Sequence, residues 1–238
     1  MTRVKICGIK SADEGLTALR LGADMLGFIF YRPVARWIEP DLAAEIIAAC
    51  RGEFPDWKAV GVFVDEPLES INQICHVCGF DVVQLAGSET PTYAAELVRP
   101  AIKVLRTREQ AWSAELLAES CAGYAVERFL VDSHLDGFYG GTGTAADWQG
   151  LAGIMDRHIL AGGLRPDNVA SALELARPWG VDVSSGVERD GRKDPSLVGR
   201  FIEAVRAFDG RWEKNPPLTS PAAAGEGQTA AAGEGLRR

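Results

Sequence analysis

The chain has 238 residues, of which 47% are hydrophobic and 24% charged, which excludes a disordered or fibrous protein. A formal net charge of −8 without an evident basic face argues against a nucleic-acid partner. No run of roughly 18 apolar residues indicates a membrane span, and no signal-like apolar region follows Met1, so we expect no membrane partner and a cytoplasmic location.

Short β-branched or apolar runs alternate along the chain with longer segments whose apolar residues recur every three or four positions. The predicted strands are 4–7, 25–30, 59–64, 82–85, 102–105, 129–132, 159–161 and 181–184. The predicted helices are 13–21, 42–49, 68–77, 93–98, 111–118 and 168–176, and Asp194-Pro195 opens another.

Strands that alternate with helices imply parallel pairing through crossover connections. Eight such units in about 210 residues predict a single α/β (β/α)₈ TIM barrel over residues 1–209. A doubly wound open sheet is the rival, which is weaker because no GxGxxG motif follows the first strand. Residues 210–238 repeat Ala-Ala-Ala-Gly-Glu-Gly and lack bulky apolar side chains, which predicts a flexible low-complexity tail.

The five cysteines are an odd number in a chain without a secretory signal, so we expect no disulfide framework. Cys75 and Cys78 form a lone CxxC inside a predicted helix, with no second pair to complete a zinc site. We therefore expect both thiols to pack in the core and predict no metal site.

Glycine-rich turns after strands seven and eight are the strongest functional signal from the residues alone. Gly162 and Gly163 precede a helix start, and Ser185 and Gly186 follow the last strand. Barrels of this type commonly bind phosphate with these two loops, so we predict a phosphate site there. The long glycine-rich loop 133–144 is typical of a lid over substrate.

Cys7 and Asp132 lie at the predicted carboxyl ends of strands one and six, where barrel enzymes place their chemistry. Lys5 is two residues before Cys7 on the same strand, so both side chains point the same way. If they face the interior, the Lys5 ammonium should lower the pKa of the Cys7 thiol. A carboxyl group sheltered from water would retain its proton, so Asp132 is a candidate acid and Cys7 a candidate base or nucleophile.

Several motifs, spread over residues 3–207, resemble the phosphoribosylanthranilate isomerase family. They are Val4-Lys-Ile-Cys-Gly-Ile, Gly27-Phe-Ile-Phe, Val60-Gly-Val-Phe-Val, Val83-Gln-Leu, Gly140-Gly-Thr-Gly, Asp147-Trp, Leu160-Ala-Gly-Gly-Leu-Arg-Pro-Asp-Asn-Val, Gly180-Val-Asp-Val-Ser-Ser-Gly-Val-Glu and Gly191-Arg-Lys-Asp.

The resemblance implies an intramolecular aldose–ketose isomerase of tryptophan biosynthesis that performs an Amadori rearrangement. Cys7 would be its general base and Asp132 its general acid, and Arg36 would bind the anthranilate carboxylate. Gly162, Gly163, Ser185 and Gly186 would hold the phosphate. The implied partner is a small phosphosugar–anthranilate substrate, with no cofactor, and the chain would act as a monomer or homodimer.

Two departures from the family pattern concern the loops around the site. Ala86 stands where the family usually has histidine, and Val34-Ala35 replaces Ser-Pro before Arg36. Neither touches the implied acid or base. The alternatives are therefore a catalytically impaired phosphate-binding barrel, suggested by Ala86, or another phosphosugar enzyme on the same scaffold.

Overall fold

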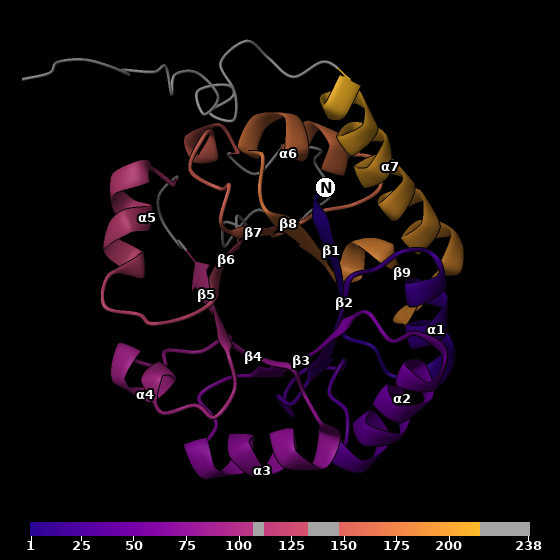
Figure 1. Cartoon of the computed structure of the whole chain (residues 1–238), viewed down its shortest axis with the longest axis vertical. Helices are drawn as coiled ribbons and strands as arrows, with labels where there is room; N and C mark the ends of the chain where they lie inside the picture. The colour runs from indigo at the N-terminus through magenta and orange to yellow at the C-terminus, as the bar shows by residue number, and fades with distance from the viewer. Residues whose placement is uncertain (107–111, 133–147, 215–238) are drawn as a thin grey trace, which may run out of the picture.

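In the computed structural model, which describes residues 1–106, 112–132 and 148–214, eight parallel strands close into a barrel (Figure 1). Its strands are β1 (Arg3–Cys7), β2 (Met25–Ile29), β3 (Lys58–Phe63), β4 (Val82–Leu85), β5 (Ala101–Arg106), β6 (Arg128–Asp132), β7 (Ile159–Ala161) and β8 (Gly180–Val183). The last strand pairs with the first through Val4↔Val181 and Lys5↔Asp182. The closed barrel confirms the predicted fold class, and every predicted strand end lies within one residue of the observed one.

The helices form a ring outside the strands, as Figure 1 shows. They are α1 (Ala12–Arg20), α2 (Pro40–Glu53), α3 (Leu68–Cys78), α4 (Pro91–Ala95), α5 (Ala114–Cys121), α6 (Val169–Ala176) and α7 (Pro195–Lys214). Short 3₁₀ turns η1 (Gln149–Leu151) and η2 (Ser185–Val187) and a small hairpin, β9 (Glu188–Arg189) with β10 (Arg192–Lys193), complete the described elements. The hairpin follows β8 directly, so it belongs to the same end of the barrel as the carboxyl ends of the strands.

Two helix predictions are corrected by the structure. Helix α5 begins at Ala114, three residues later than expected, because the Ser113 side chain caps it by accepting from the Leu116 N–H. Helix α4 begins at Pro91 behind a Thr90 cap and ends at Ala95, before the expected end at 98. In the sixth unit, for which no helix bounds were predicted, the described residues contain only the 3₁₀ turn η1.

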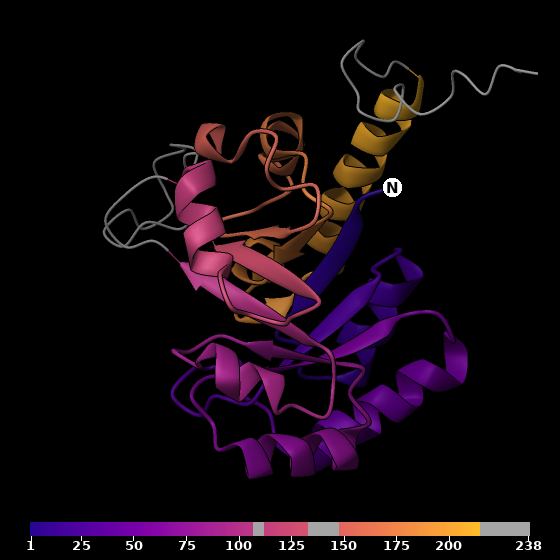
Figure 2. The ribbon, with the colours of Figure 1, turned by 60° about the vertical axis from the view of Figure 1, so that its left-hand side comes forward.

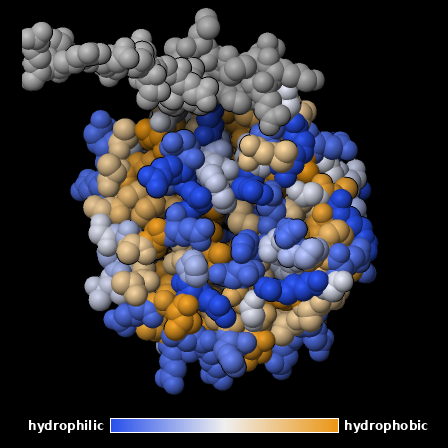
Figure 3. All heavy atoms as spheres, viewed as in Figure 1, coloured by the Kyte–Doolittle hydropathy of each residue, from blue (hydrophilic) through white to orange (hydrophobic). Residues whose placement is uncertain are grey.

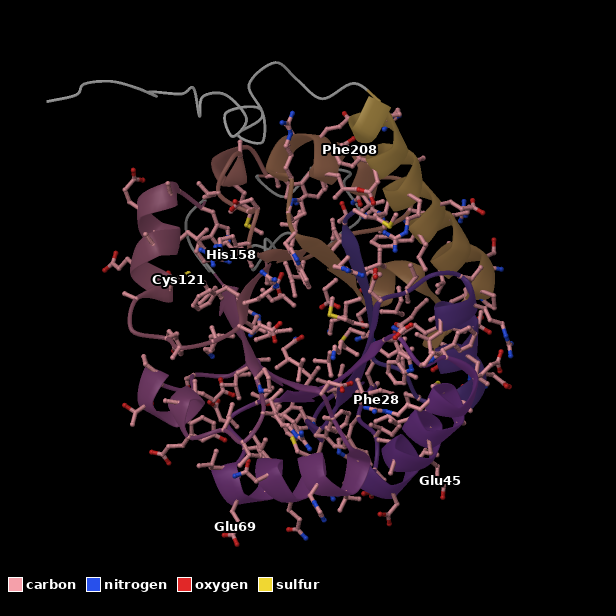
Figure 4. The ribbon with its side chains drawn as sticks, viewed as in Figure 1. Phe28, Glu45, Glu69, Cys121, His158 and Phe208 are labelled. Atoms are coloured by element: carbon pink, nitrogen blue, oxygen red, sulfur yellow. The ribbon has the colours of Figure 1, made fainter. Side chains whose placement is uncertain are left out.

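Two apolar layers fill the molecule. Alternate residues of the strands point into the barrel, where Met25, Val60, Ile102 and Leu130 pack together. The intervening residues pack outward against the helices. In Figure 4, Phe28 lies between the strand wall and the helices, whereas Glu45 and Glu69 project from α2 and α3 toward solvent.

Helix α7, at the C-terminal end of the described chain, contacts its N-terminal residues. The Asp209 carboxylate accepts from the Thr2 backbone N–H at 2.9 Å and from its hydroxyl at 2.7 Å, and Figure 2 shows the N-terminus beside this helix. The helix continues through Lys214, so the expected barrel boundary at residue 209 falls inside it. The predicted tail beyond Lys214 lies outside the described residues.

Hydrophilic side chains surround the centre of the face that is seen along the barrel axis (Figure 3). Among the described residues, no helix is both long and apolar enough to cross a bilayer.

Candidate active site

Cys7 and Lys5 point to the same side of β1, as their spacing predicted, and the structure shows that this side is the barrel interior. Cys7 is 5% exposed and belongs to the interior cluster, and Lys5 is fully buried. The Lys5 ammonium donates to Asp182 on the neighbouring strand β8 at 2.9 Å. A Cβ added to Gly27 of β2 would lie within 3.0 Å of both the Cys7 Sγ and the Lys5 Nζ, so the two groups converge on one spot that only glycine leaves open.

The predicted effect of Lys5 on the thiol is too weak to determine the net shift. Burial raises the pKa of Cys7 more than Lys5 lowers it, and Asp182 raises it further while Lys193 lowers it. For Lys5, burial is the largest influence and lowers the pKa, but Asp182 and Cys7 together outweigh it, so the pKa ends above its usual value. The neutral thiol beside a charged lysine is therefore the resting form at neutral pH.

Asp132 is the last residue of β6. It is two residues after the interior residue Leu130, so it lies on the same, interior face of the strand. Its side chain is 23% exposed, and the Arg106 guanidinium of β5 lies 3.4 Å from Oδ2. Arg106 also donates to the Ala86 carbonyl at 2.7 Å, so it bridges strands β4 and β6. Asp132 thus has a cationic neighbour instead of the apolar shelter that the sequence suggested.

The loop after β7 has a backbone conformation that favours its glycines. Gly162 and Gly163 adopt φ values of +94° and +63°, in the left-handed region that favours glycine. The Asn168 side chain donates to the Gly163 carbonyl at 3.0 Å and accepts from the Arg165 N–H at 2.7 Å, which fixes the loop just before α6. The predicted lid, 133–144, lies outside the described residues.

The loop after β8 packs directly on the loop after β7. Ser185 and Gly186 begin the 3₁₀ turn η2, and a Cβ added to Gly186 would lie 1.8 Å from the Leu164 carbonyl oxygen. This approach is open only to glycine, and it brings the two predicted phosphate loops together. Backbone amides at such turns can cradle an anion, which fits the predicted chemistry.

Arg36, in the segment between β2 and α2, reaches Glu188 at the start of β9. The Arg36 Nε–H donates to Glu188 Oε1 at 2.8 Å and an Nη2–H donates to Oε2 at 2.7 Å, a bidentate pair. The Arg36 stem crosses the loop after β1, where a Cβ on Gly8 would lie 2.8 Å from the Arg36 Cδ. Arg36 is therefore held beside the end of β1, close to Cys7.

Lys193 on β10 completes this cluster. Its ammonium donates to Glu188 Oε1 at 2.6 Å and to the Ser184 carbonyl at 3.1 Å. Burial opposes the Glu188 charge, but hydrogen bonds from Arg36 and Lys193 outweigh it and lower the pKa of Glu188 to about 2. The carboxylate is therefore ionised at neutral pH.

Sequence reasoning assigned no role to four of these charged residues: Asp182, Glu188, Lys193 and Arg106. Glu188 and Lys193 stood inside quoted motifs, but their partners are far along the chain: Arg36 is 152 residues from Glu188. The available signal was the position of a charged residue just after the last strand, where barrel loops carry function.

A cavity of about 430 Å³ opens at the opposite end of the barrel, around the residues that precede the strands. Its wall includes Arg3 and Asp24, which form an ion pair with each other at 2.7 Å, and Trp179, which stacks on Arg128. In this fold the amino end of the strands serves stability. The cavity is therefore not the site at which the predicted catalytic residues meet.

The CxxC segment on α3 packs as expected. Cys75 and Cys78 are buried in the core, and burial raises their pKa values to about 11 and about 12. Cys78 donates its S–H to the Pro40 carbonyl at 3.3 Å. Within the described ranges, no three histidine, cysteine or carboxylate side chains gather as metal ligands.

Comparison with known proteins gives the same family from sequence and from structure. The family model described as N-(5'phosphoribosyl)anthranilate (PRA) isomerase matches residues 4–204. The N-(5'-phosphoribosyl)anthranilate isomerase of Roseiflexus sp. (strain RS-1) is 45% identical over 214 residues, which cover 87% of this chain and 99% of the relative.

Two solved structures superpose on the barrel. The phosphoribosyl anthranilate isomerase of Thermotoga maritima gives a TM-score of 0.77 at 33% identity, covering 87% of this chain and all of that one. A phosphoribosyl anthranilate isomerase in complex with reduced 1-(o-carboxyphenylamino)-1-deoxyribulose 5-phosphate gives a TM-score of 0.73 at 32% identity, with the same coverage of this chain. By sequence and by fold, the chain belongs to the phosphoribosylanthranilate isomerase family.

Proposed function

We propose that this chain converts N-(5′-phosphoribosyl)anthranilate to 1-(2-carboxyphenylamino)-1-deoxyribulose 5-phosphate, the isomerase step of tryptophan biosynthesis, with Cys7 as general base and Asp132 as general acid. The observation that carries this proposal is the convergence of Cys7 and Lys5 at one barrel end, with Asp132 on the interior face of β6 at that same end. The family supplies the reaction, and the arrangement of side chains supports the roles.

The proposed chemistry needs one acid and one base. Asp132 would protonate the furanose ring oxygen, and the ring C–O bond would break as the nitrogen lone pair forms a Schiff base. The Cys7 thiolate would then remove the C2′ proton; the C–H electrons form the C1′=C2′ bond of an enolamine, and the iminium nitrogen accepts the C=N electron pair. Gain of a proton at C1′ and loss of one from the C2′ hydroxyl yield the ketone, so the product has the atoms and the oxidation level of the substrate.

The rest of the site supports a substrate with an anion at each end. The paired loops at Gly162–Gly163 and Ser185–Gly186 would hold the phosphate through backbone N–H groups. Arg36 would bind the anthranilate carboxylate, because a guanidinium fork matches that planar group better than an ammonium. We propose that no cofactor takes part, that the protein acts in the cytoplasm, and that it is a monomer or homodimer.

The direct test supplies purified protein with freshly prepared phosphoribosylanthranilate and follows the decay of its fluorescence. The protein should accelerate the decay, whereas Cys7→Ser and Asp132→Asn should each reduce turnover at least about a hundredfold, the usual contribution of a general acid or base. Circular dichroism should show an unchanged fold in both variants.

Two results would contradict the proposal. Decay at the uncatalysed rate would favour a phosphate-binding barrel that has lost activity, the alternative suggested by Ala86. Near-normal turnover in one variant would show that the substituted residue is not the proposed acid or base, although the proposed isomerase activity would still stand.

A further inference from the structure

We infer that Glu188 and Lys193 are positioning residues for substrate binding: Glu188 orients the Arg36 guanidinium, and Lys193 offsets the Glu188 charge so that Arg36 still attracts the substrate carboxylate. This inference rests on the proposed function. It gives a role to Glu188 and Lys193, which the acid–base mechanism does not use.

The geometry of the Arg36–Glu188 pair leaves one edge of the guanidinium free for a ligand. Glu188 takes one N–H on Nε and one on Nη2. A guanidinium has five N–H donors, so the end-on edge formed by Nη1 and Nη2 keeps its own pair of donors. The Arg36 side chain is 33% exposed, whereas that of Glu188 is 8% exposed. Glu188 thus occupies the Nε–Nη2 edge, and the end-on edge can meet a second carboxylate.

Charge explains why a lysine completes the cluster. Arg36 and Glu188 alone form a neutral pair, which attracts an incoming carboxylate weakly. The Lys193 side chain is 2% exposed and donates to the same Glu188 oxygen, Oε1, that Arg36 Nε contacts. Within the three side chains of Arg36, Lys193 and Glu188, two cations and one anion leave one net positive charge. Since Lys193 is buried behind Glu188, the exposed part of that charge is on Arg36.

The cluster is anchored to rigid parts of the barrel, as a positioning device requires. Lys193 also donates to the Ser184 carbonyl, and the Ser184 hydroxyl donates to the Cys7 carbonyl at 2.9 Å. The Lys193 backbone N–H donates to Glu14 of α1 at 3.1 Å. Arg36 is therefore held in a fixed relation to the strand that carries the proposed base.

The test compares two ligands that differ only in the carboxyl group: the reduced product analogue, and the same compound with phenylamino in place of carboxyphenylamino. Calorimetry gives the dissociation constant of each ligand for wild type, Glu188→Ala, Glu188→Gln and Lys193→Met. Glu188→Ala and Lys193→Met should weaken binding of the carboxylated ligand at least about tenfold, the scale of one lost charge-assisted contact. Glu188→Gln keeps one acceptor oxygen and should fall between wild type and Glu188→Ala.

The phenylamino ligand is the internal control, because its binding should change by no more than about twofold in a variant that folds and keeps its phosphate loops. Glu53→Ala is the matched protein control, since it breaks a similar Arg20–Glu53 pair on the outer helices, with N···O distances of 2.9–3.0 Å. That variant should bind both ligands as wild type does. In the turnover assay, KM should rise more than kcat falls for Glu188→Ala and Lys193→Met.

Three outcomes would overturn the inference. Equal losses for both ligands would show that the cluster supports the loops and not the carboxylate contact. Tighter binding of the carboxylated ligand to Glu188→Ala would show that Glu188 competes with the substrate for Arg36. Unchanged affinity for the carboxylated ligand in all variants would show that neither Glu188 nor Lys193 contributes to binding. If wild type binds neither ligand and shows no turnover, the proposed function itself fails, which is a result distinct from any change confined to the variants.

Discussion

At the scale of single residues, the proposed mechanism depends on the Cys7 thiol, whose buried surroundings oppose its ionisation. Burial raises the pKa of Cys7, and the nearby Lys5 ammonium offsets only part of that effect. Asp182 in turn pairs with Lys5 at 2.9 Å, which keeps the lysine charged inside the barrel. The proposed base is therefore a mostly protonated thiol that Lys5 makes easier to ionise than it would be alone.

This balance predicts the pH dependence of the isomerase. Because Cys7 is proposed to react as the thiolate and its pKa is raised, the ionisation that Cys7 contributes to the kcat/KM profile should lie above the ordinary thiol value. Lys5→Met removes the main charge that favours the thiolate, so this ionisation should move to higher pH. At pH 7, kcat/KM should fall about tenfold for each pKa unit of that shift.

Lys58→Met is a suitable control, since Lys58 lines the cavity at the opposite barrel end. Its pH profile should match that of wild type. A wild-type profile in which the thiol ionises below pH 8, or one whose thiol ionisation Lys5→Met does not move, would argue against a Cys7 base tuned by Lys5.

The sequence predicts the positions of some site residues but not their partners or their pKa values. Cys7, Lys5 and Asp132 follow from strand position and alternation, because strand ends and period-two spacing are local properties. The partners of Arg36 do not, since Glu188 meets it only after the barrel closes. The net pKa of Cys7 also escapes sequence reasoning, because desolvation depends on how deeply the fold buries the group.

At the scale of elements, the two glycine loops act as one unit. Gly186 of η2 packs so closely on the Leu164 carbonyl that any side chain there would push the loops after β7 and β8 apart. The sequence predicted both loops but not their contact. Strand ends were predicted within one residue, whereas α4 and α5 were misplaced because the capping roles of Thr90 and Ser113 went unrecognised.

Gly186→Ala tests this unit. The added methyl group would collide with backbone, so the free energy of unfolding should fall by about 1–3 kcal/mol, as for an overpacked site. Affinity for the phosphate-bearing product analogue should fall about tenfold, which calorimetry measures.

Gly153→Ala provides the comparison, because Gly153 has φ +77° and nothing within 4 Å of an added Cβ. That variant should lose about 1 kcal/mol of stability through backbone strain alone and keep wild-type affinity. If Gly186→Ala binds the product analogue with unchanged affinity, η2 is not part of the phosphate site.

At the scale of the whole molecule, barrel closure gathers the site from the two ends of the chain. Strand β1 pairs with β8, and Asp209 of α7 binds Thr2 just before β1. Cys7 from the start of the chain thus lies beside Ser184 and Lys193 from its later part. The alternation of strands and helices predicted this closure, because eight parallel units have few other ways to bury both faces of their strands.

We propose that Cys7, Asp132, Arg36 and the two glycine loops act on one ligand. The decisive experiment is a crystal structure with the reduced product analogue bound. We predict the C2′ atom about 3–3.5 Å from Cys7 Sγ, the hydroxyl derived from the ring oxygen within hydrogen-bond distance of Asp132, the carboxylate on Arg36, and the phosphate between the two loops. A ligand bound at the opposite end of the barrel, or one that leaves either Cys7 or Asp132 out of contact, would contradict the account.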